Sequence, residues 1–428
     1  MTAIVVLFTL MLVLILLGVP LVYSIGVASG VLLLSHDDLN VTLLAARMFK
    51  GVDSFVLTAI PFFLLAAELL SQGGLTQRII ELTRLLLGHL RGALAQVNIA
   101  VSMIFAGIQA SCTADSAAIG GVMIPAMIRE RYDKDLSVVV TATSSCIGPI
   151  IPPSILMILY AFLTNTSVAR LFLGGAIPGL LLGVALMGLT HYWVRRRGYP
   201  RGQERMGSIR EIARKGVTTS PALLVPLIIV GGLVGGVVTP TEAGVLACLA
   251  AFLVSGLCYR ELSAQAIVMA FKKAAQTTAT IWAVIAVSTV FSEICVRYQL
   301  TRHLVSFLGV FGSEPFVILL VMTTMVFVLG MAIDTTPLLI MLAKPLHDAA
   351  MLVGVDPIHL GVVLVMTALM GTVSPPVALL LCLNCGIAQM PLRGTFGLIW
   401  SYLAVMLGVV LLCILVPELV TWLPDRFL

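Results

Sequence analysis

The chain has 428 residues, of which 60% are hydrophobic and 11% are charged, with a formal net charge of +5 and a mean hydropathy of +1.11. These values lie outside the range of soluble globular proteins and predict a polytopic membrane protein. The sequence contains no G-x-x-x-x-G-K-[ST] motif, which argues against an ATP-driven step in this chain.

The apolar runs predict an all-α protein. The first run lacks a basic n-region and a small-residue cleavage site, so we expect a transmembrane helix there and not a removed signal peptide. Spans are predicted at 2–17, 21–35, 55–72, 136–163, 170–194, 221–238, 242–258, 278–296, 358–384 and 396–423, and helical hairpins at 94–128 and 315–351. Four segments with basic residues at helical spacing, 40–52, 75–90, 261–275 and 298–309, predict amphipathic helices at the interface, either as a supporting frame or as ordinary loop helices.

The chain divides into two similar halves, 1–195 and 219–428, joined by a polar and basic linker at 196–218. Each half carries a hairpin followed by an apolar segment that contains two adjacent prolines. If both hairpins enter and leave on one side, each half crosses the membrane an odd number of times, and the second half is inverted. Placing the linker in the cytoplasm puts most of the 25 Lys and Arg residues on that side and both termini in the periplasm, as the positive-inside rule prefers.

The double prolines lie in "GPIIPPS" (148–154) and "GTVSPPV" (371–377). A proline inside a helix leaves carbonyl groups unpaired, which is costly in hydrocarbon unless these groups face protein, water or an ion. Two breaks at corresponding positions of inverted repeats are the best sequence indication of a midplane binding site in a secondary transporter. Kinks that serve only packing are the alternative.

Each hairpin has a polar tip between apolar flanks, "GIQASCTADSA" (107–117) and "GMAIDTTP" (330–337). Oxygens of Ser, Thr, Asp and the backbone suit a hard cation, whereas a proton relay would need only carboxylates, so Na+ is favoured as coupling ion. The first tip is expected to pair with the first break and the second tip with the second break, which predicts two or more ions. The candidate Na+ ligands are Gly107, Ser111, Thr113, Asp115, Ser144, Ser145 and Gly148 in the first half, and Asp334, Thr335, Thr367, Gly371, Thr372 and Ser374 in the second.

An anionic substrate needs donors, and nearly every Arg falls at a predicted membrane boundary. Backbone N–H groups and hydroxyls are therefore expected to hold a carboxylate. The candidate substrate-binding residues are Ser111, Thr113, Thr335, Thr336, Pro152 and Pro375.

Other acidic groups and the cysteines have competing explanations. Asp115 is either a cation ligand or the cap of the second hairpin arm. Glu68 and Glu293 are expected to be structural partners of nearby Arg residues, and Glu242 also lies beside an apolar run. The eight cysteines fall in apolar runs, so neither a disulfide framework nor a metal role for Cys382 and Cys385 is expected.

Several segments, in order along the chain, resemble the large membrane subunit of the tripartite ATP-independent periplasmic (TRAP) transporters. They are "IPFFLLAAELLSQGGLTQRI", "TADSAAIGGVMIPAMIRERYDKDLSVVVTATSSCIGPIIPPSILMILY", "GVVTPTEAGVLA", "LGMAIDTTPLLIMLAKP" and "GVDPIHLGVVLVMTALMGTVSPPVALLL". The resemblance implies a Na+-coupled, elevator-type importer in a bacterial inner membrane. It also implies two partners, a separate small four-helix membrane subunit and a periplasmic binding protein that delivers an organic anion such as a C4-dicarboxylate, a keto acid or a sugar acid.

The chain departs from the family pattern at Gln109 and Cys112, where Ser or Gly is more usual, at Arg131 and Tyr132, and after the second double proline. Three other functions compete with the leading one. A related stand-alone Na+/anion symporter would need no binding protein, a passive channel would show no accumulation, and an intramembrane aspartyl protease would use Asp115 and Asp334. No enzymatic activity is expected.

Overall fold

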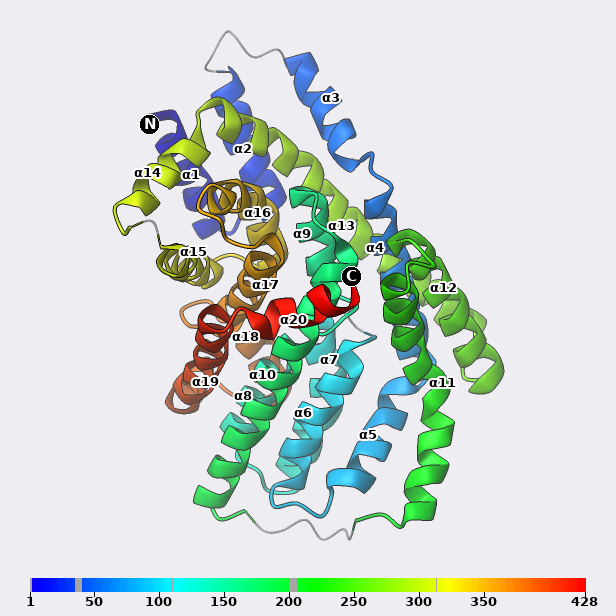
Figure 1. The fold of residues 1–428 in the computed structure, drawn as a ribbon. Coiled ribbons are helices and arrows are strands. Elements are labelled where there is room, and N and C mark those ends of the chain that lie inside the picture. The colour runs from blue at the N-terminus through cyan, green and yellow to red at the C-terminus, as the bar shows by residue number, and fades with distance from the viewer. Residues whose placement is uncertain (1, 35–40, 109–110, 200–205, 313) are drawn as a thin grey trace.

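The computed structural model describes residues 2–34, 41–108, 111–199, 206–312 and 314–428. Within these residues every regular element is helical, which confirms the predicted all-α class. The helices form two groups that are interleaved in the sequence (Figure 1).

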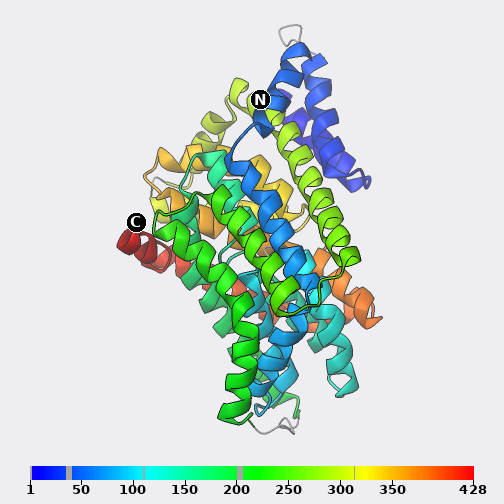
Figure 2. The same cartoon turned by 90° about the vertical axis from the view of Figure 1, so that its right-hand side faces the viewer.

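We call the first group the scaffold. Within it, α4 packs against α12 and α13, and α11 packs against α5 and α12. Figure 2 shows α4, α11, α12 and α13 side by side along one flank of the molecule. The members of the scaffold are α1 (Thr2–Leu16), α2 (Leu21–Leu34), α3 (Val41–Val52), α4 (Ala59–Gln72), α5 (Leu75–Leu87), α11 (Ile209–Val234), α12 (Pro240–Leu253), α13 (Ala264–Arg297) and α14 (Leu300–Gly309).

The second group, called the hairpin group, contains both hairpins and both broken helices. Its members are α6 (Ala93–Ala106), α7 (Cys112–Arg129), α8 (Lys134–Ser144), α9 (Ile155–Thr164), α10 (Val168–Arg196), α15 (Pro315–Gly330), α16 (Thr335–Met351), α17 (Pro357–Val373), α18 (Leu379–Ala388), α19 (Phe396–Leu415) and α20 (Glu418–Phe427). The second arm of each hairpin packs against the broken helix of its own half, α7 on α8 and α16 on α17, and also against the far piece of the other broken helix, α18 or α9.

Five helical stretches within the described residues are long and apolar enough to cross a membrane, which makes the protein multi-pass. A sixth candidate is the pair Ala45–Val52 and Val56–Gln72, which bends by 63°. The five stretches are Val168–Arg196, Ile209–Val234, Pro240–Cys258, Ala264–Arg297 and Leu392–Leu415.

Three predicted boundaries are wrong. The segments 261–275 and 278–296 are one helix, α13, because no Gly or Pro separates the basic stretch from the apolar one. The end of the linker at 196–218 is helical, since α11 begins at Ile209 with a capping box between Ser208 and Glu211. The predicted span 396–423 ends at Leu415, and a shorter helix, α20, follows Pro417.

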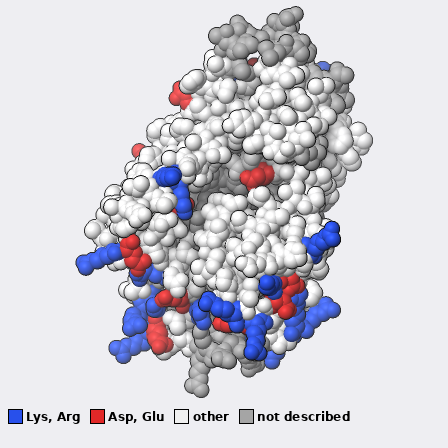
Figure 3. All heavy atoms as spheres, turned by 180° about the vertical axis from the view of Figure 1, so that it is seen from behind, with Lys and Arg blue, Asp and Glu red and all other residues white. Residues whose placement is uncertain are grey.

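Charged side chains gather at one end of the molecule. Figure 3 shows most of the visible Lys and Arg residues, interspersed with Asp and Glu, at the lower end. The ends of α10 and α11 that flank the linker lie at this end in Figure 1. The surface above them consists mostly of uncharged residues, as expected for a face in contact with lipid.

Candidate functional site

The first hairpin tip ends where α7 begins, and Ser111 is the N-cap of this helix. The backbone N–H of Ala114 donates to Ser111 Oγ at 3.4 Å, and Ser111 Oγ lies 3.1 Å from Thr113 Oγ1. The alternative that Asp115 caps the arm is therefore wrong. Asp115 points instead into the interior of the hairpin group, where its side chain is fully buried.

Asp115 belongs to a buried hydroxyl cluster that joins the hairpin to the first broken helix. Ser102 Oγ lies 3.1 Å from Asp115 Oδ2 and 3.2 Å from Ser144 Oγ. Ser145 Oγ donates to the carbonyl of Thr141 at 2.8 Å. Asp115 Oδ1 has no hydrogen-bond partner within the described residues. A buried carboxylate oxygen without a donor is costly, and a cation would satisfy it.

The second tip contacts the second broken helix through backbone. A Cβ added at Gly371 would lie 2.4 Å from the carbonyl carbon of Gly330, so only glycine permits this approach. Thr335 Oγ1 donates to the carbonyl of Ala368 at 3.4 Å. Asp334 is the N-cap residue of α16, but its carboxylate makes no capping hydrogen bond and lines a cavity.

The hydroxyls near the second break donate to their own helix. Thr367 donates to the carbonyl of Val363, Thr372 to that of Leu369 and Ser374 to that of Met370, at 2.6 to 2.7 Å. Each hydroxyl oxygen keeps lone pairs that can accept or coordinate. At the first break, Gly148 follows the short helical turn Ser145–Ile147 and is buried.

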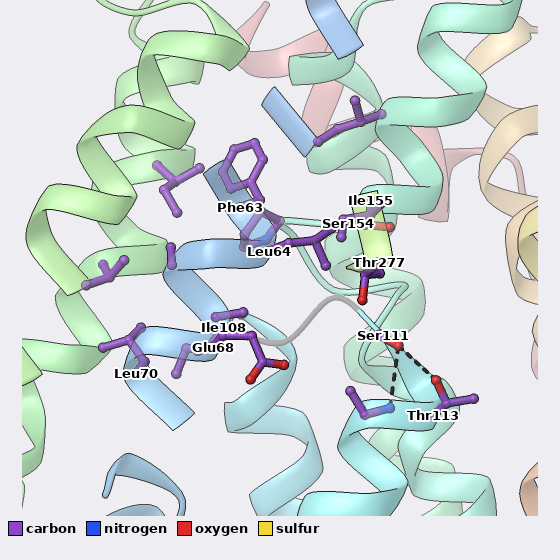
Figure 4. A pocket seen from close by; sticks show the side chains of 18 residues that line it. Phe63, Leu64, Glu68, Leu70, Ile108, Ser111, Thr113, Ser154, Ile155 and Thr277 are labelled. Carbon is purple, nitrogen blue, oxygen red and sulfur yellow. Dashed lines mark hydrogen bonds between the residues drawn. The ribbon is translucent and has the colours of Figure 1, made fainter. Parts of the chain in front are cut away.

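Two cavities lie between the hairpin group and the scaffold. The first, of about 280 Å³, is bounded by the first tip, the first break, α4 and α11. The second, of about 370 Å³, is bounded by both tips, the first break and α13. The two cavities share Leu64, Ser111, Thr113, Ile155 and Thr277, so they adjoin. Figure 4 shows Ser111, Thr113 and Thr277 beside the first cavity, with Glu68 on α4 across from them.

Most of the predicted substrate residues line these cavities. Ser111, Thr113, Thr335 and Thr336 line the second one, as does Cys112. The prolines that line the cavities are Pro149, Pro153 and Pro337, and a role of Pro152 and Pro375 in substrate binding stays a prediction. Gln109 lies outside the described residues.

The sequence analysis missed the scaffold wall. Its polar side chains are Glu68 on α4 and Gln276, Thr277 and Thr280 on α13, and apolar residues of α4, α11 and α13 complete it. The three α13 residues recur at helical spacing and therefore form one polar stripe. The stripe can be recognised in the sequence as polar residues at helical spacing. It was missed because a helix boundary was predicted between 275 and 278, within the stripe.

The other acidic residues have the following surroundings. Glu293 Oε2 lies 3.3 Å from Arg47 Nη1, as expected, whereas Glu68 pairs with a lysine, Lys273, at 3.7 Å. Glu242 completes a capping box with Thr239 at the start of α12. Between Cys382 and Cys385, Asn384 Nδ2 donates to Ser116 Oγ at 2.6 Å, which links α18 to the first hairpin.

Comparisons with known proteins find relatives of this chain in sequence and in fold. The family model described as "Tripartite ATP-independent periplasmic transporter, DctM component" matches residues 8–419. The sialic acid TRAP transporter large permease protein SiaM of Vibrio cholerae is 32% identical over 416 residues, 96% of each chain. The C4-dicarboxylate TRAP transporter large permease protein DctM of the same organism is 31% identical, over 99% of this chain and 97% of that protein. The YdaH transporter of Alcanivorax borkumensis has a similar fold, with a TM-score of 0.64 at 14% identity over 87% of this chain and 86% of that one.

Proposed function

Because the chain belongs to the DctM family of TRAP transporter large membrane components, which import organic acids, we propose that it carries an organic anion by Na+-coupled, elevator-type movement of the hairpin group. The observation that carries the proposal is the position of the paired cavities. They lie between both hairpin tips on one side and α4, α11 and α13 on the other. Cargo held there lies between the hairpin group and the scaffold, which also contact each other directly where α5 packs on α6 and where α13 and α14 pack on α16.

The elevator part of the proposal is supported by the packing of the two groups. The hairpins and broken helices interlock across the halves, since α7 packs on α18 and α16 on α9. Movement of one hairpin therefore carries the other with it. Rigid-body sliding of one packed unit against another is a common route to alternating access.

Sodium coupling is supported by the chemistry of the tips. At the first tip, Asp115, Ser102 and Ser144 converge, and Asp115 Oδ1 lacks a donor. At the second, the closely packed backbone of Gly330 and Gly371 lies beside Thr335 and Ser374. These oxygens fit a hard monovalent cation, which acts here as co-transported cargo. We also propose Gly107, Gly148, Thr367 and Thr372 as individual Na+ ligands.

The cavities suit an organic anion that also carries hydroxyl or carbonyl groups. The second cavity presents the hydroxyls of Ser111, Thr113, Thr280, Thr335 and Thr336, and the described residues that line either cavity include no Lys or Arg. Hydroxyls and helix amino ends can bind one carboxylate, and they can both accept from and donate to hydroxyls on the cargo. A sugar acid or a keto acid meets these requirements better than a compact dicarboxylate.

We extend the family arrangement to the partners and the orientation. TRAP large components work with a small membrane subunit and a periplasmic binding protein. We propose that this chain works with both, and that the charged end in Figure 3 faces the cytoplasm of a bacterium while both termini face the periplasm.

Uptake by reconstituted vesicles tests the proposal. The chain is reconstituted with its small subunit, and the binding protein loaded with labelled sugar acid, keto acid or C4-dicarboxylate is added outside. Accumulation that requires the binding protein and an inward Na+ gradient supports the proposal. Accumulation by this chain alone would identify a stand-alone symporter, and equilibration without accumulation would identify a passive channel.

A further inference from the structure

Glu68 stands in an unusual place for a cavity that takes an anion. It lines the first cavity, and its side chain is only 18% exposed. Figure 4 shows its carboxylate in the space between α4, Ser111 and Thr277. An unpaired carboxylate there would repel an anionic cargo, because Coulomb interactions are strong where water is largely excluded.

The charge that offsets Glu68 comes from the facing scaffold helix. Lys273 Nζ on α13 lies 3.7 Å from Glu68 Oε2, and the lysine side chain is 49% exposed. Lys273 is one helical turn before Thr277, which lines both cavities, so it extends the polar stripe of Gln276, Thr277 and Thr280. The stripe therefore ends in a cation.

The contact between Lys273 and Glu68 is looser than other ion pairs of the protein. Lys215 Nζ and Glu81 Oε2 are 2.5 Å apart, and Arg197 Nη2 and Asp135 Oδ2 are 2.6 Å apart. A flexible, half-exposed lysine at 3.7 Å can change its partner without breaking a short hydrogen bond. A second carboxylate that enters the cavity can compete for it.

We infer that Glu68 and Lys273 form an exchangeable ion pair, in which the carboxylate of the cargo replaces Glu68 as the partner of Lys273 as it passes the scaffold wall. This inference rests on the proposed function and adds to it a cationic side chain on the scaffold side of the cavities. Lys273 attracts the anion, and Glu68 then displaces it, so that the cargo is not retained.

The exchange predicts opposite effects for the two single variants in the reconstituted system. In Lys273→Gln the attraction is lost and Glu68 is left uncompensated, so the KM for the anion rises roughly tenfold. In Glu68→Gln the competitor is lost, so KM falls by about threefold and the maximal rate falls with it because release slows. In the double variant KM lies closer to that of the unmodified protein than in Lys273→Gln alone.

Lys272→Gln is the matched control, because it removes the same charge from the neighbouring residue, which points about 100° away on the same helix. Its KM should stay unchanged. A purely structural ion pair would instead lower the yield of folded protein in both single variants and leave KM alone. That result, or equal KM values for Lys273→Gln and Lys272→Gln, would overturn the inference. Absence of Na+-dependent uptake by the unmodified protein would instead contradict the proposed function.

Discussion

Asn384 donates through Nδ2 to Ser116 Oγ at 2.6 Å, and both side chains are fully buried although 268 residues separate them in the chain. Asn384 lies on the far piece of the second broken helix, and Ser116 lies next to Asp115 on the first hairpin. The bond therefore connects the neighbourhood of one break to the candidate cation cluster of the other half. It adds a directional polar contact between α18 and α7, which apolar packing alone would leave free to slide against each other.

Replacing Asn384 by Leu should weaken this link. The buried hydroxyl of Ser116 loses its donor, and we expect a loss of stability of about 1–3 kcal/mol. Thermal unfolding in detergent checks this, with the double variant Asn384→Leu, Ser116→Ala as comparison. Because that variant leaves no unpaired hydroxyl, it should recover part of the loss. Additive losses would show that the two residues do not interact.

Asp115→Asn tests the first cation cluster. The change removes a negative charge while keeping the shape, so the Na+ concentration that half-activates uptake should rise at least about tenfold, since charged ligands dominate the binding of a hard cation. Ser102→Ala, which removes a neutral neighbour at 3.1 Å, should have a smaller effect in the same direction. Unaltered Na+ activation in Asp115→Asn would exclude the carboxylate as a ligand.

Gly371→Ala tests the close approach of the second tip to the second broken helix. The added Cβ would lie 2.4 Å from the carbonyl carbon of Gly330, so the two helices must separate. We expect a destabilisation of about 1–3 kcal/mol and loss of uptake. Gly386→Ala, on the helix that follows the same break, meets nothing within 4 Å and serves as control. Equal melting temperatures for the two variants would contradict the observed contact.

Cys112 offers a chemical test of the second cavity. A variant that keeps Cys112 as its single cysteine should react slowly with a small, polar, thiol-directed reagent, because Cys112 is largely buried, with 7% of the residue exposed, but lines the cavity. The reaction should block uptake, and saturating cargo should slow it at least severalfold. In a matched variant that keeps only Cys146, which is fully buried, labelling should be much slower. Labelling that ignores the cargo would place the substrate elsewhere.

Local signals in the sequence were sufficient for some features of the fold and site and insufficient for others. Both hairpin regions could be located because their signals lie in residues that are neighbours in the chain. These signals are double prolines inside apolar runs and polar tips between apolar arms. The packing of α7 on α18 depends on contacts between residues far apart in the chain, which no local pattern encodes. The contribution of Glu68 and Lys273 was missed for a similar reason, because each reads as an interfacial charge until α4 and α13 are seen side by side.

Sodium is expected to drive the uptake of an organic anion through the cavities between the hairpin group and the scaffold. The most direct measurement is uptake of a labelled organic acid into vesicles that contain the chain and its small subunit, with loaded binding protein outside. We expect accumulation above the external concentration under an inward Na+ gradient, and loss of this accumulation when a sodium ionophore dissipates that gradient. Equal accumulation in buffers that contain only K+ would contradict it.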